Sequence, residues 1–312
     1  MFYRKHLWGL FMLLALPLFL FSSCQSEEES TSEAEGQCTI TFTVSNYRQI
    51  SFDDLSSSAS TRAVPSDHPA TLAHLLIAFY NAETGQQACL IQHDQKDYEN
   101  QDDAYPKFSV TLPYGRYHVI VLGFNGSQGC KITSVNNISW NNDYVPNTFL
   151  YYDDLTLDKN TNLDQKLTLR RVVTAFRLTA EDAIPTGLKK MRFISTVGGT
   201  VLDAATGYAS QNTGRTGDMF VPADSVGKQG VCFTSYLFLS DEQAQSNYVI
   251  QALGQNDNVL YEKRFNDVPL RINVLTEWKG KFFEASSDEG EYKTGFSLYW
   301  DTQWADTITI AQ

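Results

Sequence analysis

The chain has 312 residues, a formal net charge of −12, 42% hydrophobic residues and 13% aromatic residues. An acidic chain of this kind repels nucleic acid and anionic lipid head groups, so we expect neither as a partner. The apolar content is sufficient for packed cores, and the length is sufficient for about two domains, so a chain that is disordered throughout is excluded.

The N-terminal stretch has the features of a signal peptide. Arg4 and Lys5 precede an apolar run that extends over residues 7–21 and contains Pro17. This run is shorter than the roughly 20 apolar residues of a membrane-spanning helix, and small residues follow it. We therefore expect residues 1–23 to direct export and then to be removed.

The end of this stretch predicts a lipid anchor. Phe21, Ser22 and Ser23 precede Cys24, in a pattern that resembles the lipobox of bacterial lipoproteins, although the lipobox favours Leu where Phe21 stands. The resemblance implies that Cys24 becomes the acylated first residue, and more than one acyl chain makes membrane attachment stable. The alternative is an ordinary secretory signal in which Cys24 has no such role.

An acidic segment follows the cysteine. Residues 24–36 are polar and include Glu27, Glu28 and Glu29, which predicts a flexible tether. The segment resembles the tag that sends lipoproteins of some Gram-negative anaerobes to the outer face of the outer membrane, and the alternative is a solvated linker. Without residues 1–23 the chain keeps 22 basic and 36 acidic residues, a net charge near −14.

Short apolar alternations separated by turn residues predict an all-β chain. Residues 38–44 alternate apolar side chains with threonine and serine, which is the pattern of a half-buried strand. A hairpin is expected at 108–124, around Pro113-Tyr114-Gly115. Further strands are expected at residues 72–80, 88–92, 155–157, 165–169, 172–178, 191–197, 201–202, 231–239, 248–253, 259–265 and 278–283. Strands this short and numerous favour β-sandwiches over helix-linked parallel sheets.

Some segments lack the alternation. Residues 131–153 are rich in asparagine and aromatic residues and are expected to form a long loop. Only residues 181–186 and 240–246 favour a helical turn.

Arg170 and Arg171 mark a candidate domain boundary, because the alternation starts again directly after them. We therefore expect an N-terminal β-sandwich over residues 37–170 and a C-terminal β-sandwich over residues 171–284. Residues 285–312 are expected to be a linker followed by a C-terminal strand.

That C-terminal tail is a candidate for strand exchange. Its apolar residues alternate with polar ones in two short runs, as in a strand that docks on another sheet edge. These residues are Phe296, Leu298, Trp300, Ile308 and Ile310.

The sequence offers little sign of catalysis. The histidines are scattered, and no GxSxG, GxxxxGK[ST], GxGxxG or HExxH motif is present. Four cysteines besides Cys24 are far apart, which argues against zinc and leaves three disulfide connectivities open; these are Cys38, Cys89, Cys130 and Cys232. We expect no enzyme activity, no cofactor and no metal site.

Two local clusters admit a binding interpretation. His118 is expected to be a hydrogen-bonded sheet histidine rather than a catalytic one, and Asp153-Asp154 to be solvated loop charges rather than calcium ligands. An aromatic cluster could form either a sugar-stacking face or, as we favour, core or interface packing; it comprises Trp140, Tyr144, Phe149, Tyr151 and Tyr152.

Several segments, taken in order, resemble the FimB-type fimbrial anchor proteins of the fimbrillin superfamily. They are the lipobox, "TLPYGRYHVIVLGFNG" at 111–126, "LRRVVTAFRL" at 169–178, "VPLRINVLTEWKGKFF" at 268–283 and "FSLYWDTQWADTITI" at 296–310. Asn273, Thr276, Gly280 and Phe282 match the most recognisable part of the family pattern. The resemblance implies two tandem transthyretin-like β-sandwiches in a lipoprotein of type V pili, where a strand of one subunit completes the sheet of the next.

The resemblance also implies partners and a processing site. The partners would be fimbrillin-like pilus subunits and, through the lipid, the outer membrane. Shaft subunits of such pili are cleaved after an arginine, and Arg62 is the matching candidate here. In an anchor we expect Arg62 to stay intact, because cleavage would separate Cys24 from the body. Alternatives are a shaft or tip subunit and a surface glycan-binding lipoprotein.

Overall fold

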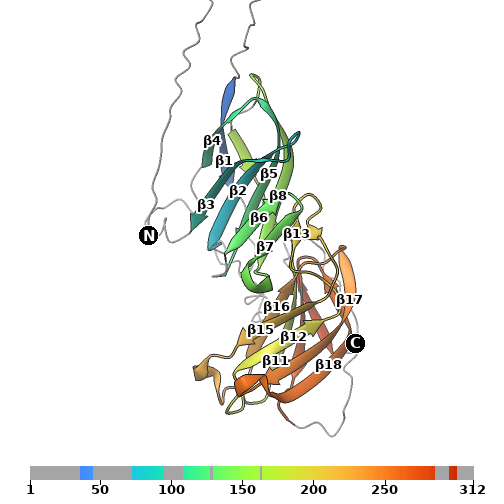
Figure 1. Cartoon of the computed structure of the whole chain (residues 1–312). Coiled ribbons are helices and arrows are strands. Elements are labelled where there is room, and N and C mark those ends of the chain that lie inside the picture. The colour runs from blue at the N-terminus through green and yellow to red at the C-terminus, as the bar shows by residue number, and fades with distance from the viewer. Residues whose placement is uncertain are drawn as a thin grey trace, which may run out of the picture. The chain divides into compact units, whose positions relative to one another are not determined.

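The computed structural model describes residues 36–44, 72–94, 108–126, 129–161, 164–284 and 295–300 (Figure 1). These residues are all-β and form sandwiched sheets, which confirms the expected fold class. Within these ranges the helical elements are three short 3-10 turns, η2 (Asn141–Asp143), η3 (Ala223–Ser225) and η4 (Gln255–Asp257). No described helix is long or apolar enough to cross a membrane.

The first two sheets enclose one apolar core. A three-stranded sheet has the order β4 (Phe108–Pro113), β1 (Gln37–Val44), β9 (Asp164–Leu167). A five-stranded sheet has the order β10 (Arg170–Arg171), β8 (Thr148–Leu157), β5 (Gly115–Phe124), β2 (His74–Asn81), β3 (Gln87–Asp94). Alternate side chains of both sheets form the first core, which includes Ile40, Phe42, Phe79, Val119 and Val121.

Two further sheets enclose a second core. One has the order β16 (Val231–Leu237), β11 (Thr174–Ala180), β19 (Val274–Gly280), β20 (Phe296–Trp300). The other has the order β15 (Arg215–Phe220), β12 (Lys190–Ser195), β17 (Gln243–Leu253), β18 (Val259–Arg271). The second core includes Phe176, Phe193, Tyr248, Ile250 and Phe265.

A small sheet and a third core join segments from both sides of Arg170. The small sheet has the order β14 (Tyr208–Ala209), β13 (Leu202–Asp203), β7 (Asn137–Trp140), β6 (Cys130–Ser134). The third core packs outer-face residues of β2 and β5 against residues from later segments, and it includes Leu76, Ile120, Leu122, Trp140 and Phe238. The domain boundaries expected from the sequence stay a prediction.

The predicted hairpin at 108–124 is wrong. Both strands exist, but β4 pairs with β1 whereas β5 pairs with β2 and β8. The chain therefore passes from one sheet to the other at Tyr114, whose N–H donates to the carbonyl of Gly36 at 2.8 Å. Local turn residues predicted a break between the two strands but not the change of sheet, because the change of sheet depends on distant strands.

Three other local predictions are wrong. The expected loop at 131–153 contains β6, β7 and the start of β8, because short strands with distant partners leave little local alternation. Residues 240–246 form no helical turn, since β17 begins at Gln243, and residues 181–186 lie between strands without a helix. Asp153 and Asp154 lie in β8 rather than in a loop.

Candidate strand-exchange sites

The C-terminal strand β20 occupies a sheet edge of its own chain. It pairs antiparallel with β19, from Trp278 opposite Phe296 to Val274 opposite Trp300. The other side of β19 pairs with β11, so among the described residues β20 has one strand neighbour. Of the predicted tail residues, Phe296, Leu298 and Trp300 thus lie in an edge strand.

Phe296 of β20 packs against the second core. Phe296 is half-buried, and its ring lies 6.1 Å from that of Phe176 and 6.5 Å from that of Phe265, measured between centroids. Leu298 is also half-buried. As an edge strand, β20 can separate from β19 without breaking the pairing between other strands.

A buried carboxylate fixes the point where the chain leaves the second core. Asp182 accepts hydrogen bonds from the main-chain N–H groups of Phe282, Phe283 and Glu284, at 2.9, 2.5 and 2.9 Å. Asp182 is 8% exposed, so water has little access to these three hydrogen bonds. These bonds hold residues 282–284 to the turn that contains Asp182.

The N-terminal strand β1 occupies the middle of its sheet. It pairs antiparallel with β4 and parallel with β9. Its inward side chains Cys38, Ile40, Phe42 and Val44 are all less than 10% exposed, as the alternation predicted. Removal of β1 would leave an apolar groove between β4 and β9.

Several predicted site residues lie outside the described residues. Cys24 comes before β1 in the chain and Arg62 comes after it. Neither residue is described, and the same is true of Ile308 and Ile310.

The motif residues near the C-terminus serve the fold. Asn273 has a positive φ of 61°, and its side-chain oxygen accepts a hydrogen bond from buried Arg171 at 3.0 Å. Thr276 is fully buried, and its hydroxyl donates to a main-chain carbonyl of β18. A Cβ at Gly280 would lie 2.7 Å from the indole ring two residues earlier. Phe282 is 1% exposed, so folding alone accounts for all four positions.

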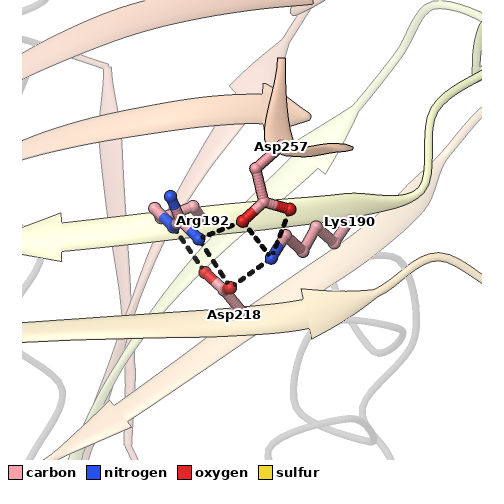
Figure 2. Close-up of polar contacts among 4 residues, drawn as sticks. All are labelled: Lys190, Arg192, Asp218 and Asp257. Atoms are coloured by element: carbon pink, nitrogen blue, oxygen red, sulfur yellow. Dashed lines mark hydrogen bonds and ion pairs between the residues drawn. The ribbon is translucent and has the colours of Figure 1, made fainter. Parts of the chain in front are cut away.

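An ion cluster that the sequence did not reveal lies on the sheet of β12 and β15 (Figure 2). The Nζ atom of Lys190 lies 2.7 Å from Asp218 and 2.8 Å from Asp257. Arg192 reaches the same two carboxylates at 2.7 and 3.1 Å. Lys190 and Arg192 are two residues apart on one strand, so the sequence alone predicts that they share a face of the sheet. Their acidic partners come from β15 and η4, and no local pattern predicts that pairing.

The cluster neutralises its own charges. Hydrogen bonds from Arg192 and Lys190 lower the pKa of Asp218 to about 2, against a smaller effect of burial. The hydrogen bond from Lys190 lowers the pKa of Asp257, and hydrogen bonds to Asp218 raise the pKa values of Lys190 and Arg192. Two cations and two anions therefore stay charged and paired at neutral pH, which suits a structural tie and provides no free acid or base.

Residues that could bind metal or form disulfides are dispersed in the described part of the chain. No group of three His, Cys, Asp or Glu side chains there is placed to hold a metal ion. Cys38, Cys89, Cys130 and Cys232 are free thiols, and burial raises the pKa of Cys130 to about 12, which makes it unreactive.

The aromatic cluster is divided between core and surface. Trp140 and Phe149 are 4% and 2% exposed, which confirms the core interpretation for these two residues. Tyr144, Tyr151 and Tyr152 are half-buried. A sugar-stacking face that uses the indole of Trp140 is therefore not available.

Three solved structures show a partial likeness to the chain. The fimbrial anchor protein Mfa2 from Porphyromonas gingivalis is 10% identical, with a TM-score of 0.38, and the match covers 84% of this chain and 98% of that one. The tip fimbrial protein Mfa3 of the same organism is 9% identical, with a TM-score of 0.39, and the match covers 85% of this chain and 99% of that one. A protein of Bacteroides ovatus ATCC 8483 described as a candidate adhesin is 11% identical, with a TM-score of 0.44. The match covers 79% of this chain and 88% of that one. Likeness at these values does not by itself assign a function.

The sequence comparisons give a family without a known activity. No curated protein matches the chain. The sequence model of a family of unknown function (DUF6562) matches residues 30–310, so the chain belongs to this family.

Proposed function

We propose that the chain is a structural cell-surface lipoprotein that anchors fimbriae, or takes part in their assembly, by exchanging β-strands with other pilus subunits. The observation that supports this most is β20, which ends the described chain and has one strand neighbour. Such a strand can leave one edge and add to another, where main-chain hydrogen bonds supply affinity and alternate side chains supply register. The proposal includes no catalytic step.

The position of β1 fits an anchor rather than a shaft subunit. While Arg62 stays uncut, β1 remains between β4 and β9 and links the body to Cys24. The groove under β1 is then filled, so no donor strand can enter it. A subunit of this kind would hold the membrane end of a fibre and stop its growth there.

Deletion of residues 296–312 tests the proposal. We expect the deleted protein to reach the cell surface in normal amount, because β20 lies at a sheet edge, but to be absent from purified fimbriae. Surface amount is measured by antibody binding to whole cells, and incorporation by blotting sheared fimbriae. Unchanged incorporation would remove the tail as the coupling element.

A shaft or tip subunit is the second candidate, because Arg62 lies in the connection between β1 and β2. N-terminal sequencing of the surface-exposed protein separates the two positions. A chain that begins at Cys24 supports the anchor, whereas a chain that begins at Ala63 supports the shaft.

A further inference from the structure

A hollow of about 230 Å³ lies over β5 and β8 and is open to solvent. Arg116 and His118 of β5, Asp154 and Thr156 of β8, and Ala82 from the turn after β2 line it. The register places Arg116 opposite Thr156 and His118 opposite Asp154, so these four side chains point to the same face of the sheet. This volume lies below the roughly 300–1,000 Å³ of sites for drug-sized ligands, so the hollow fits only a smaller ligand.

The hollow is built on a rigid base. Tyr117 and Leu155 alternate with the wall residues, and their side chains pack into the first core, so they turn main chain towards the hollow. Both β5 and β8 are interior strands of the five-stranded sheet. The wall side chains are therefore carried by backbone that is paired on both sides.

Hydrogen bonds hold an ionised carboxylate in the wall. The Nδ1 atom of His118 lies 2.6 Å from Oδ1 of Asp154, and the hydroxyl of Tyr152 donates to the same oxygen at 3.1 Å. The hydrogen bond with His118 lowers the pKa of Asp154, while burial is the main cause that raises the pKa of Tyr152 to about 12. Asp154 is therefore charged at neutral pH, and its Oδ2 atom has no hydrogen-bond partner among the described residues.

The neighbouring cross-strand pair, Arg116 and Thr156, offers donors. The guanidinium of Arg116 reaches Glu83 through one nitrogen at 3.4 Å and is otherwise exposed, and Thr156 adds a hydroxyl. An anion would meet the carboxylates of Asp154 and Glu83, and a cation would meet Arg116. A ligand with adjacent donor and acceptor atoms and no net charge can bond to both cross-strand pairs.

We propose that this hollow binds a neutral saccharide, a ligand whose neighbouring hydroxyls can donate to Asp154 and accept from Arg116. The hollow is shallow, so a bound sugar stays partly in water and the dissociation constant is on the order of 1 mM. The sugar can be free or part of a longer glycan, since both present the same hydroxyls. The inference does not depend on strand exchange, which involves other strands.

Saturation-transfer NMR on the full mature chain tests the proposal, because this method detects weak ligands. The probes are the methyl glycosides of glucose, galactose and mannose and an oligosaccharide of each sugar, at 10 mM. We expect saturation transfer to at least one methyl glycoside, and at least a fivefold loss of that signal in the Asp154→Asn and Arg116→Gln variants. Stronger transfer to the oligosaccharide would identify a glycan chain as the source, and equal transfer would identify the single sugar.

Two further variants keep the result interpretable. Asp224→Asn changes an equally exposed aspartate beside Lys228 and should leave the signal unchanged. Thr156→Val removes a wall hydroxyl but leaves the bonds among His118, Tyr152 and Asp154 intact, and should weaken the signal. The proposal is overturned if no probe shows transfer, if Asp154→Asn and Asp224→Asn behave alike, or if only charged sugars such as methyl glucuronide bind.

Discussion

At the scale of single residues, Asp182 is a buried carboxylate that joins two distant segments by three hydrogen bonds. Asp182 precedes by about 100 positions the three N–H groups from which it accepts hydrogen bonds. It therefore connects the segment after β11 to the segment after β19. No local pattern predicts these hydrogen bonds, because one aspartate in a turn resembles any other. Only the fold shows that the carboxylate is 8% exposed and triply bonded.

Replacement of Asp182 by alanine should lower the free energy of unfolding by about 3 kcal/mol, because several main-chain donors lose their partner in a buried site. Urea unfolding of the mature chain measures the change. The exposed Asp224→Ala variant is the control and should stay within about 0.5 kcal/mol of the wild type. Equal stability of the two variants would show that the carboxylate has no special role.

Asp218 should make stability depend on pH in the acid range. Its pKa is lowered to about 2 in the folded state, so its contribution is fully present above the unfolded value near 3.8 and is lost as the pH falls towards 2. Asp218→Asn should cost about 1 kcal/mol at pH 7, after allowance for solvent screening. The difference between wild type and variant should shrink between pH 4 and pH 2, as followed by urea midpoints, and a constant difference would contradict the assignment.

At the scale of elements, regular alternation was a reliable guide and irregular segments were not. The inward and outward faces of β1 follow its threonines, and the alternation in residues 296–300 predicted β20. The pairing of β20 with β19 was not predictable, because pairing is fixed by core packing between distant segments. β15 went unpredicted because Arg215-Thr-Gly-Asp-Met-Phe220 is polar, and its strand form depends on pairing with β12.

The exchangeability of β20 predicts unequal costs for two phenylalanines that touch. Phe176→Ala should lower the free energy of unfolding by about 3–5 kcal/mol, because Phe176 is fully buried in the second core. Phe296→Ala should cost only about 1 kcal/mol, because the side chain is half-buried on an edge strand. Chemical denaturation of both variants gives the comparison. Equal costs would mean that β20 is as integral to the fold as β11.

At the scale of the whole molecule, the proposed function links a lipid near one end of the chain to an edge strand near the other. The sequence predicted the all-β class and the tail strand, and the structure confirms both. The ion cluster and the hollow over β5 and β8 could not be predicted, because each assembles side chains from separate strands. The net charge of −12 agrees with partners that are proteins or neutral sugars rather than nucleic acid.

The lipid end of this account predicts a change of location. Cys24→Ala should move the protein from the membrane fraction to the soluble fraction, because acyl chains supply the membrane affinity and the acidic body repels anionic lipid. Fractionation of cells followed by blotting measures the distribution. A variant that sediments with membranes as fully as the wild type would contradict the lipoprotein assignment.

The most direct test of strand exchange is photo-crosslinking in cells that assemble fimbriae. A photoreactive residue replaces exposed Ser297 of β20, and a second variant carries it at exposed Thr216 of the edge strand β15 as the control. The account predicts a covalent adduct between a pilus subunit and the chain labelled at position 297, and none from position 216. No intermolecular adduct from position 297, or equal adducts from both positions, would contradict it.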